Sequence, residues 1–323
     1  MMISPRKARK VWGSAVAGLV GAVGVVVAAG CGAAGASPGP VPTPAPSSMA
    51  QVELPIAAYE LTDQQSAEEE YLNLRLEQVC MSRLGFRFLP GLSAGYIADG
   101  VRIQREVDSR RYGVTDLAAV RGYGYYLPPW TAGPGTPVPV GSLPHAEQVA
   151  LLGQSTGQGS GSSSAAASSI SRSNPPPGGC RGWSQGQLAA AGVSAQQTSA
   201  TALAAQIRQD AFDKAQSDPR VRAVFVKWSA CMRSHGYGYS TPFTAAADPR
   251  WNKTGPASRS EITTAETDVA CKLQANVLGV DFAVESDYEN AAIAKNAGTL
   301  AQAKADDNIA ARGLNHLLAK YRN

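Results

Sequence analysis

The chain has 323 residues, of which 44% are hydrophobic and 17% charged, and its formal net charge is +4. The positive excess lies at the N-terminus, where four basic residues have no acidic neighbour, so residues 31–323 carry 25 bases and 25 acids. This balance argues against the basic surface that nucleic acids or anionic membranes require. We therefore expect no nucleic-acid partner.

Residues 1–30 have the layout of a secretory signal peptide. Arg6, Lys7, Arg9 and Lys10 precede an apolar run that extends to residue 29, and this order is typical of an exported chain. The run ends in "VAAGC", which resembles the lipobox of bacterial lipoproteins. The resemblance implies that Cys31 is lipidated, with acyl chains such as palmitate, and becomes the new N-terminus. The alternative is an uncleaved membrane anchor, for which the run is just long enough.

A lipid on Cys31 would hold the protein on the outer face of the cytoplasmic membrane, because several acyl chains bind more firmly than one. This extracytoplasmic location is oxidising. Without Cys31 the chain retains an even set of cysteines, Cys80, Cys180, Cys231 and Cys271. Two disulfide bonds are therefore expected.

Two stretches of low complexity divide the chain. Residues 31–52 are rich in Pro, Ala and Gly and are interpreted as a tether between the membrane and the folded part. Residues 153–177 contain "GQSTGQGSGSSSAAASS" and three consecutive prolines, and are interpreted as a linker. The folded part then consists of an N-terminal helical segment with an aromatic loop, 53–152, and a second helical segment, 178–323, each long enough for a core.

Helix signals dominate the first segment. Thr62 and Gln65 form a capping box ahead of an apolar stripe that runs to Gly85. The stretch "YGVTDLAAVRGYGYYLPPW", residues 112–130, is dense in Gly and aromatic residues. It predicts a short helix at 115–121 followed by an irregular loop.

The second segment has equally clear helix signals. Asp218 and Pro219 predict a helix start, and apolar residues keep helical spacing from there to Gly236. Ser258 and Glu261 predict another start. The helix expected at 259–285 is apolar on two faces, which favours a central position in a bundle. A further helix is expected to reach Tyr321, with an interruption near residue 298.

These signals predict a mainly α fold, a small disulfide-stapled helical bundle with irregular aromatic loops. Strand content should be limited to at most a short β-pair, near 86–89 and 237–240, where alternation replaces helical spacing.

One motif occurs twice, as "CMSRLGFRF" from Cys80 and as "CMRSHGYGY" from Cys231. In both copies a Gly follows the Cys by five residues, where a helix C-cap would lie. The motif is therefore interpreted as a helix end that carries a structural cysteine. Four cysteines allow three pairings. The repeat favours one bond in each half, Cys80 with Cys180 and Cys231 with Cys271, whereas a Cys80–Cys231 bond would contradict it.

The sequence offers no catalytic residue. Gly153 to Gly157 match the G-x-S-x-G pattern, but the surrounding Gly/Ser tract lacks the strand and helix that a nucleophile elbow needs. His235 is interpreted as a helix C-cap rather than as a general base or ligand. The cysteines lack the paired short spacing of zinc sites. We therefore expect no metal and no cofactor, and an enzyme remains a lesser alternative.

The best candidate for ligand contact is the aromatic loop. Its side chains could form a platform on which a sugar ring or a partner peptide stacks, although aromatic residues more often pack in a core. The residues proposed for stacking are Tyr123, Tyr125, Tyr126 and Trp130.

Several blocks resemble a family of secreted lipoproteins from actinobacteria. They are "LPIAAYELT" at 54–62, the two Cys-Met motifs, "RRYGVTD" at 110–116 with "YGYYLP", "GGCRG" at 178–182, "WSACMRSHGY" at 228–237, and the "VACK" and "DFAVES" elements at 269–286. The resemblance implies secretion, anchoring and paired cysteines. It transfers no catalytic residue, because the family has no defined activity.

Together these features favour a lipid-anchored, non-enzymatic binding or interaction module of the cell envelope, with a cell-wall or protein partner. Two alternatives stay open. One is a hydrolase of cell-wall polymers that uses carboxylates, which two acids across a cleft would favour. The other is a purely structural surface protein.

Overall fold

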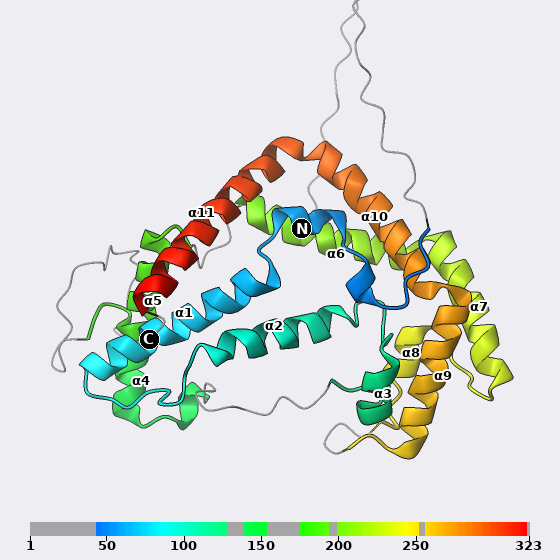
Figure 1. Cartoon of the computed structure of the whole chain (residues 1–323), viewed down its shortest axis with the longest axis horizontal. Coiled ribbons are helices and arrows are strands. Elements are labelled where there is room, and N and C mark those ends of the chain that lie inside the picture. The colour runs from blue at the N-terminus through cyan, green and yellow to red at the C-terminus, as the bar shows by residue number, and fades with distance from the viewer. Residues whose placement is uncertain (1–42, 128–138, 154–174, 194–198, 252–255, 322–323) are drawn as a thin grey trace, which may run out of the picture. The chain divides into compact units, whose positions relative to one another are not determined.

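A computed structural model describes residues 43–127, 139–153, 175–193, 199–251 and 256–321. Over these ranges the chain forms eleven α-helices and three short 3₁₀ helices, and no β-strand (Figure 1). The mainly α prediction is confirmed, and the residues considered for a β-pair are loops. The expected signal peptide, Cys31 with the rest of residues 31–42, Trp130, and residues 154–174 of the expected linker lie outside the described residues. None of the described helices is both long enough and apolar enough to span a membrane.

Single residues separate α6 from α7, α9 from α10 and α10 from α11, and longer connections join the other α-helices. The α-helices are α1 Asp63–Arg83, α2 Gly95–Asp108, α3 Leu117–Tyr123, α4 His145–Leu152, α5 Gly179–Ala190, α6 Ser199–Ser217, α7 Pro219–Ser234, α8 Pro242–Ala246, α9 Arg259–Ala275, α10 Val277–Lys295 and α11 Ala297–Tyr321. The 3₁₀ helices are η1 Met49–Gln51, η2 Pro55–Tyr59 and η3 Val140–Ser142. All of them belong to one unit, Pro38–Asn323.

Side-chain caps begin the helices where the sequence predicts. Thr62 and Gln65 form the capping box at the start of α1, and Asp218 accepts a hydrogen bond from the N–H of Arg220 in α7. At α9, Ser258 accepts from the N–H of Glu261, but the Glu261 carboxylate accepts from the N–H of Tyr125. In a capping box this carboxylate would accept from the backbone of the N-cap residue. Here it holds the aromatic loop instead.

The prediction of a single helix at 259–285 is wrong, because α9 ends at Ala275 and α10 begins at Val277. Asn276 between them has a left-handed backbone, φ 55° and ψ 44°. Asn tolerates this conformation better than most residues, and its Nδ2 donates to the carbonyl of Pro44 at 2.8 Å. Leu273, near the end of α9, is 50% exposed. The next interruption, at Asn296, lies two residues before the expected position.

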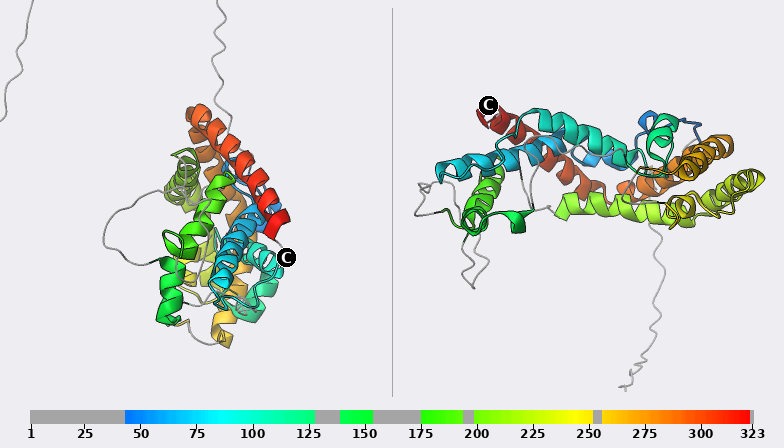
Figure 2. Two further views of the ribbon diagram at one scale, coloured as in Figure 1. Left: turned by 90° about the vertical axis from the view of Figure 1, so that its left-hand side faces the viewer. Right: turned by 90° about the horizontal axis from the view of Figure 1, so that it is seen from below.

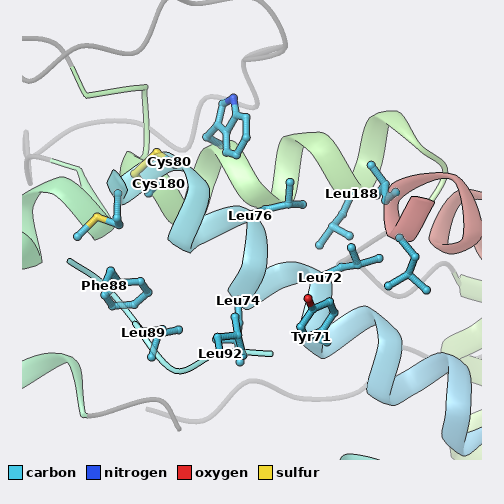
Figure 3. Close-up of a cluster of buried hydrophobic side chains, with 14 of the residues drawn as sticks. Tyr71, Leu72, Leu74, Leu76, Cys80, Phe88, Leu89, Leu92, Cys180 and Leu188 are labelled. Atoms are coloured by element: carbon cyan, nitrogen blue, oxygen red, sulfur yellow. A yellow bond between two sulfur atoms is a disulfide. The ribbon is translucent and has the colours of Figure 1, made fainter. Parts of the chain in front are cut away.

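The largest core forms around α1. Helix α1 contacts α2, α4, α5 and α11 (Figure 2), and the side chains between them form one buried cluster. Figure 3 shows Leu72 and Leu76 of α1 beside Leu188 of α5, with the Cys80–Cys180 disulfide in the same cluster. The predicted segments 53–152 and 178–323 therefore share this core.

A second core forms where α7, α8 and α9 meet the start of α10, around the fully buried Trp228. A third and smaller core lies around Ile56 of η2, with residues of α6 and Leu300 of α11. Helix α6 contacts both α10 and α11. Helices α6 and α11 also contribute residues to the lining of the candidate site.

The two Cys-Met motifs are two copies of one helix end. In α1 the N–H of Phe86 bonds the carbonyl of Met81, and in α7 the N–H of Tyr237 bonds that of Met232. The glycines between them, Gly85 and Gly236, have φ of 83° and 86°. This is the Schellman arrangement. The cysteines pair as the repeat favours, Cys80 with Cys180 and Cys231 with Cys271.

Candidate functional site: an acidic cavity between α1, α2, α6 and α11

A cavity of about 650 Å³ lies between the first turns of α1, the end of α2, the first half of α6 and the middle of α11. The segments just before α1 and just after α5 complete its wall. The side chains and backbone around it come from Tyr59, Glu60, Leu61, Asp63, Ser66, Glu69, Gln104, Asp108, Arg111, Gly192, Val193, Thr201, Ala205, Arg208, Asp306, Asp307, Ile309 and Ala310.

Negative charge dominates the lining. It contains two arginines, Arg111 and Arg208, and six carboxylates, Glu60, Asp63, Glu69, Asp108, Asp306 and Asp307. Arg208 forms an ion pair with Glu60, and its Nε donates to both carboxylate oxygens, at 3.0 and 2.9 Å. Arg111 forms an ion pair with Glu285, which lies outside the lining. Both arginines are thus engaged, and Asp63 forms an ion pair with Arg105 at 3.5 Å. Among the described residues, Glu69, Asp108 and Asp307 form no ion pair, and their charge is left for a ligand to meet.

Burial and mutual repulsion make ionisation of the lining carboxyls costly. Burial raises the pKa of Asp307 to about 6, and the charges of Asp306 and Glu60 add to the shift. Burial likewise raises the pKa of Asp108, with a further contribution from Asp63, and that of Glu69. The Oδ2 atom of Asp307 is buried and has no hydrogen-bond partner among the described residues. A cation in the cavity would relieve both conditions.

Arg111 connects the cavity to a row of buried acids on α10. Asp281, Glu285 and Glu289 follow at four-residue intervals, so they share one face of the helix, and each is 0% exposed. Glu285 accepts hydrogen bonds from Arg111 and from the hydroxyl of Tyr112, the latter at 2.6 Å. Glu285 is therefore the best-satisfied acid of the row.

The two outer acids of this row have weaker partners. Asp281 accepts from Nε2 of Gln216 at 3.0 Å, and Glu289 accepts from the N–H of Ile56 at 2.9 Å. Burial raises the pKa of each to about 7, and the charge of Glu285 adds to the shift in both. The repeated four-residue spacing was visible in the sequence and could have identified these acids.

Of the residues proposed for stacking, Tyr125 packs in the core. Tyr125 is 8% exposed and stacks on Trp251, with ring centroids 5.8 Å apart. Its backbone N–H is held by Glu261 at 3.1 Å, which turns the ring into the second core. Tyr126 is half-buried, Tyr123 is exposed, and Trp130 lies outside the described residues. None of the three described tyrosines lines the cavity, and stacking of a ligand on the aromatic loop stays a prediction.

Donors that could hold a metal come together at one further place. Over the described ranges, the group that meets this condition is Cys231, His235 and Cys271, whose donor atoms all lie within 4.8 Å of one another. The two sulfurs are bonded to each other in this structure. No three acids of the cavity lining meet the same condition among the described residues.

Protein-family models, curated proteins and solved structures include no match to this chain. The resemblance to actinobacterial lipoproteins stays a prediction. A functional conclusion therefore depends on the chemistry of the cavity.

Proposed function

We propose that this chain is a lipid-anchored, extracytoplasmic binding protein whose acidic cavity takes a small molecule with two or more amino or guanidino groups. The observation that carries the proposal is a lining of six carboxylates around about 650 Å³, with both lining arginines engaged in ion pairs. Cavities of about 300–1,000 Å³ are typical of small-molecule sites.

The electrostatics favour a polyvalent cation. Carboxylates that are partly buried near one another lose solvation and repel, which is why the pKa of Asp307 is raised to about 6. Ammonium groups placed among these carboxylates would attract them at short range. A partly buried pair of opposite charges interacts more strongly than the same pair in bulk water. A neutral ligand of the same shape offers no such compensation.

The location rests on the sequence. The charged and apolar regions of residues 1–30 and the lipobox-like "VAAGC" support export and lipidation of Cys31. Metabolic labelling with a palmitate analogue tests this point. We expect label on the wild-type chain and none on Cys31→Ser, and label on Cys31→Ser would contradict lipidation at that residue.

Calorimetric titration of the full chain with spermidine at pH 8 tests the binding function. We expect saturable binding, and Asp108→Asn and Asp307→Asn should each weaken it about fivefold, the loss of about 1 kcal/mol. Asp213→Asn serves as the matched control, because Asp213 is exposed on α6 and does not line the cavity. Absence of binding, or equal losses in all three variants, would contradict the proposal.

A second candidate is a hydrolase of cell-wall polymers that uses two carboxyls. The observation in its favour is the raised pKa of Asp307 beside Asp306 and Glu60, because a general acid must hold its proton near neutral pH. Release of soluble fragments from purified cell wall would support it, provided that Asp307→Asn abolishes the release. Binding of spermidine without such release favours the first proposal and also counts against a purely structural role.

A further inference from the structure

Cys231, His235 and Cys271, here called the Cys–His cluster, come from two helices that pack together. Cys231 lies in the last turn of α7, His235 caps that helix, and Cys271 lies in α9. Two sulfurs and a ring nitrogen lie within 4.8 Å of one another. We propose that reduction of the Cys231–Cys271 disulfide converts this cluster into a binding site for Zn²⁺, with two thiolates and one imidazole as ligands.

The backbone holds the three donors in place without the disulfide. Cys231 and His235 are four residues apart at the end of α7, so they share one face of the helix. The N–H of His235 bonds the carbonyl of Met232 at 3.1 Å, and Gly236 closes the Schellman turn. Cys271 is 0% exposed and belongs to the core between α7 and α9. Its sulfur therefore stays oriented toward α7 by packing.

The hydrogen bonds of the imidazole favour the tautomer that a ligand needs. Nδ1 of His235 lies 2.9 Å from the carbonyl oxygen of Cys231. The hydroxyl of Ser234 donates to the same oxygen at 2.7 Å, so its proton is already engaged. Nδ1 then carries the proton and donates, which leaves the lone pair on Nε2. An imidazole that donates to a backbone carbonyl is the usual outer-shell arrangement of histidine ligands.

The repeat provides an internal comparison. In the first Cys-Met motif, Leu84 occupies the position that His235 occupies in the second, and Leu84 is 1% exposed. The first helix end therefore has a cysteine pair with a hydrocarbon beside it, and the second has a cysteine pair with a nitrogen donor. Each copy has the same Schellman helix end and a cysteine in a disulfide bond. His235 is therefore required for neither of these features.

Accessibility also differs between the two disulfides. Cys80 and Cys180 are both 0% exposed. Cys231 is half-buried, so an external thiolate can reach its sulfur. A dithiol reductant would attack Cys231, break the S–S bond, and leave as a cyclic disulfide after supplying two electrons and two protons. Binding of Zn²⁺ then displaces the two thiol protons.

Three protein ligands leave one tetrahedral position open, as in zinc sites that keep a water molecule. Oε1 of Gln274 lies 3.3 Å from Sγ of Cys231 and is close enough to contact such a water. None of the three cluster residues lines the acidic cavity. The site is therefore independent of the proposed binding function.

Titration of the reduced full chain with Co²⁺ as a probe for Zn²⁺ tests the proposal. Thiol counting first establishes the reduced state, and the reductant is removed under argon. We expect one equivalent of Co²⁺ to bind, with thiolate charge-transfer bands in the near ultraviolet and the visible bands of a tetrahedral ion, and Zn²⁺ to displace it. The oxidised chain should show none of these bands.

Variants decide which residues bind the ion. His235→Leu, which recreates the first motif, should weaken Co²⁺ binding by at least ~100-fold, the upper effect of losing a supporting residue. The Cys80→Ser/Cys180→Ser chain should keep the bands, whereas Cys231→Ser should lose them. Unaltered binding in His235→Leu, or no binding to a reduced chain that keeps its helical circular dichroism, would overturn the proposal. Loss of that dichroism on reduction of the Cys80→Ser/Cys180→Ser chain would overturn it equally, because the helices would then not hold the donors.

Discussion

Lys272 and Asp268 form an ion pair in the interior of the protein, with Nζ 2.8 Å from Oδ2 and the two residues only 2% and 0% exposed. Lys272 also donates to the carbonyl of Val114 at 2.9 Å, and Asp268 accepts from the indole of Trp228 at 2.8 Å. Burial lowers the pKa of Lys272 and raises that of Asp268, and the opposite charge of each partner counteracts these shifts. The pair thus ties α9 to α7 and to the segment before α3.

Replacing the cation should be strongly destabilising. Lys272→Met leaves the Asp268 charge buried without its partner, so the free energy of unfolding should fall by about 3–5 kcal/mol. Adding Asp268→Asn should recover part of this loss, because the amide oxygen still accepts from Trp228 while the charge is gone. Urea denaturation monitored by circular dichroism measures both.

The exposed pair of Arg121 and Glu266, 2.9 Å apart, is the matched control. Arg121→Met should cost less than about 1 kcal/mol, because solvent screens this pair. Equal losses in Lys272→Met and Arg121→Met would contradict the special role of the buried pair.

A second prediction concerns the helix stop at Gly236. Its φ of 86° is a left-handed conformation, and an added Cβ would meet no atom within 4 Å. Gly236→Ala should therefore lose about 1–2 kcal/mol of stability through backbone strain alone. Gly238→Ala is the control, because that position is equally open and lacks a positive φ. A change within about 0.5 kcal/mol is expected there, and a similar loss at both sites would disprove the strain argument.

The helix ends were the most predictable part of the fold. A cap at Thr62 or Asp218 and a Gly such as Gly236 satisfy requirements of the local backbone, so neighbouring residues suffice to identify them. The break at Asn276 was not predictable in this way. The apolar spacing continues through it, and Asn276 donates the supporting hydrogen bond to the carbonyl of Pro44, more than two hundred positions earlier in the chain.

The cavity could not be predicted because its lining comes from elements far apart in the sequence. The charges of Asp63, Asp108 and Asp307 meet only after α1, α2 and α11 have packed. Density of aromatic residues around Tyr125 did not distinguish a surface platform from a core. The distinction depends on Trp251 and Glu261, which are distant in sequence and reach the loop only in the folded chain.

The buried acids of α10 should give stability an unusual pH dependence. The pKa of Asp281 is about 7 in the folded chain, above its ordinary value of 3.8. The folded state then holds a proton that the unfolded state releases, so this group reduces stability as pH rises from about 4 to about 7, and the full penalty persists above that. Glu285 and Lys272 are the charged groups that face it.

Asp281→Asn should therefore be more stable than the wild type at pH 8, by about 2–4 kcal/mol, and about equal to it at pH 4. The amide oxygen can still accept from Gln216. Thermal unfolding at both pH values measures the difference, with the exposed Asp213→Asn as a control that should follow the wild type. A parallel pH profile in Asp281→Asn and the wild type would show that Asp281 is ionised in the folded chain.

The last prediction concerns the pH dependence of cation binding in the cavity. Spermidine stays protonated between pH 5 and pH 8, because alkyl amines have a pKa near 10, so any change must come from the protein. With its pKa raised to about 6, Asp307 is ionised at pH 8 and mostly neutral at pH 5. Neutral Asp307 should bind about as weakly as the Asp307→Asn variant, so binding should be about fourfold weaker at pH 5 than at pH 8.

Two variants separate this effect from a general loss of charge. The Asp307→Asn variant should bind spermidine more weakly at pH 8. Its affinity should also depend less on pH, since the main titrating group of the cavity is gone. Arg208→Gln should bind more tightly at pH 8, because it removes the cation that Glu60 now contacts. Weaker binding in Arg208→Gln would mean that this arginine serves an anionic group of the ligand, and the cavity would then have to be assigned to a zwitterion instead of a polyamine.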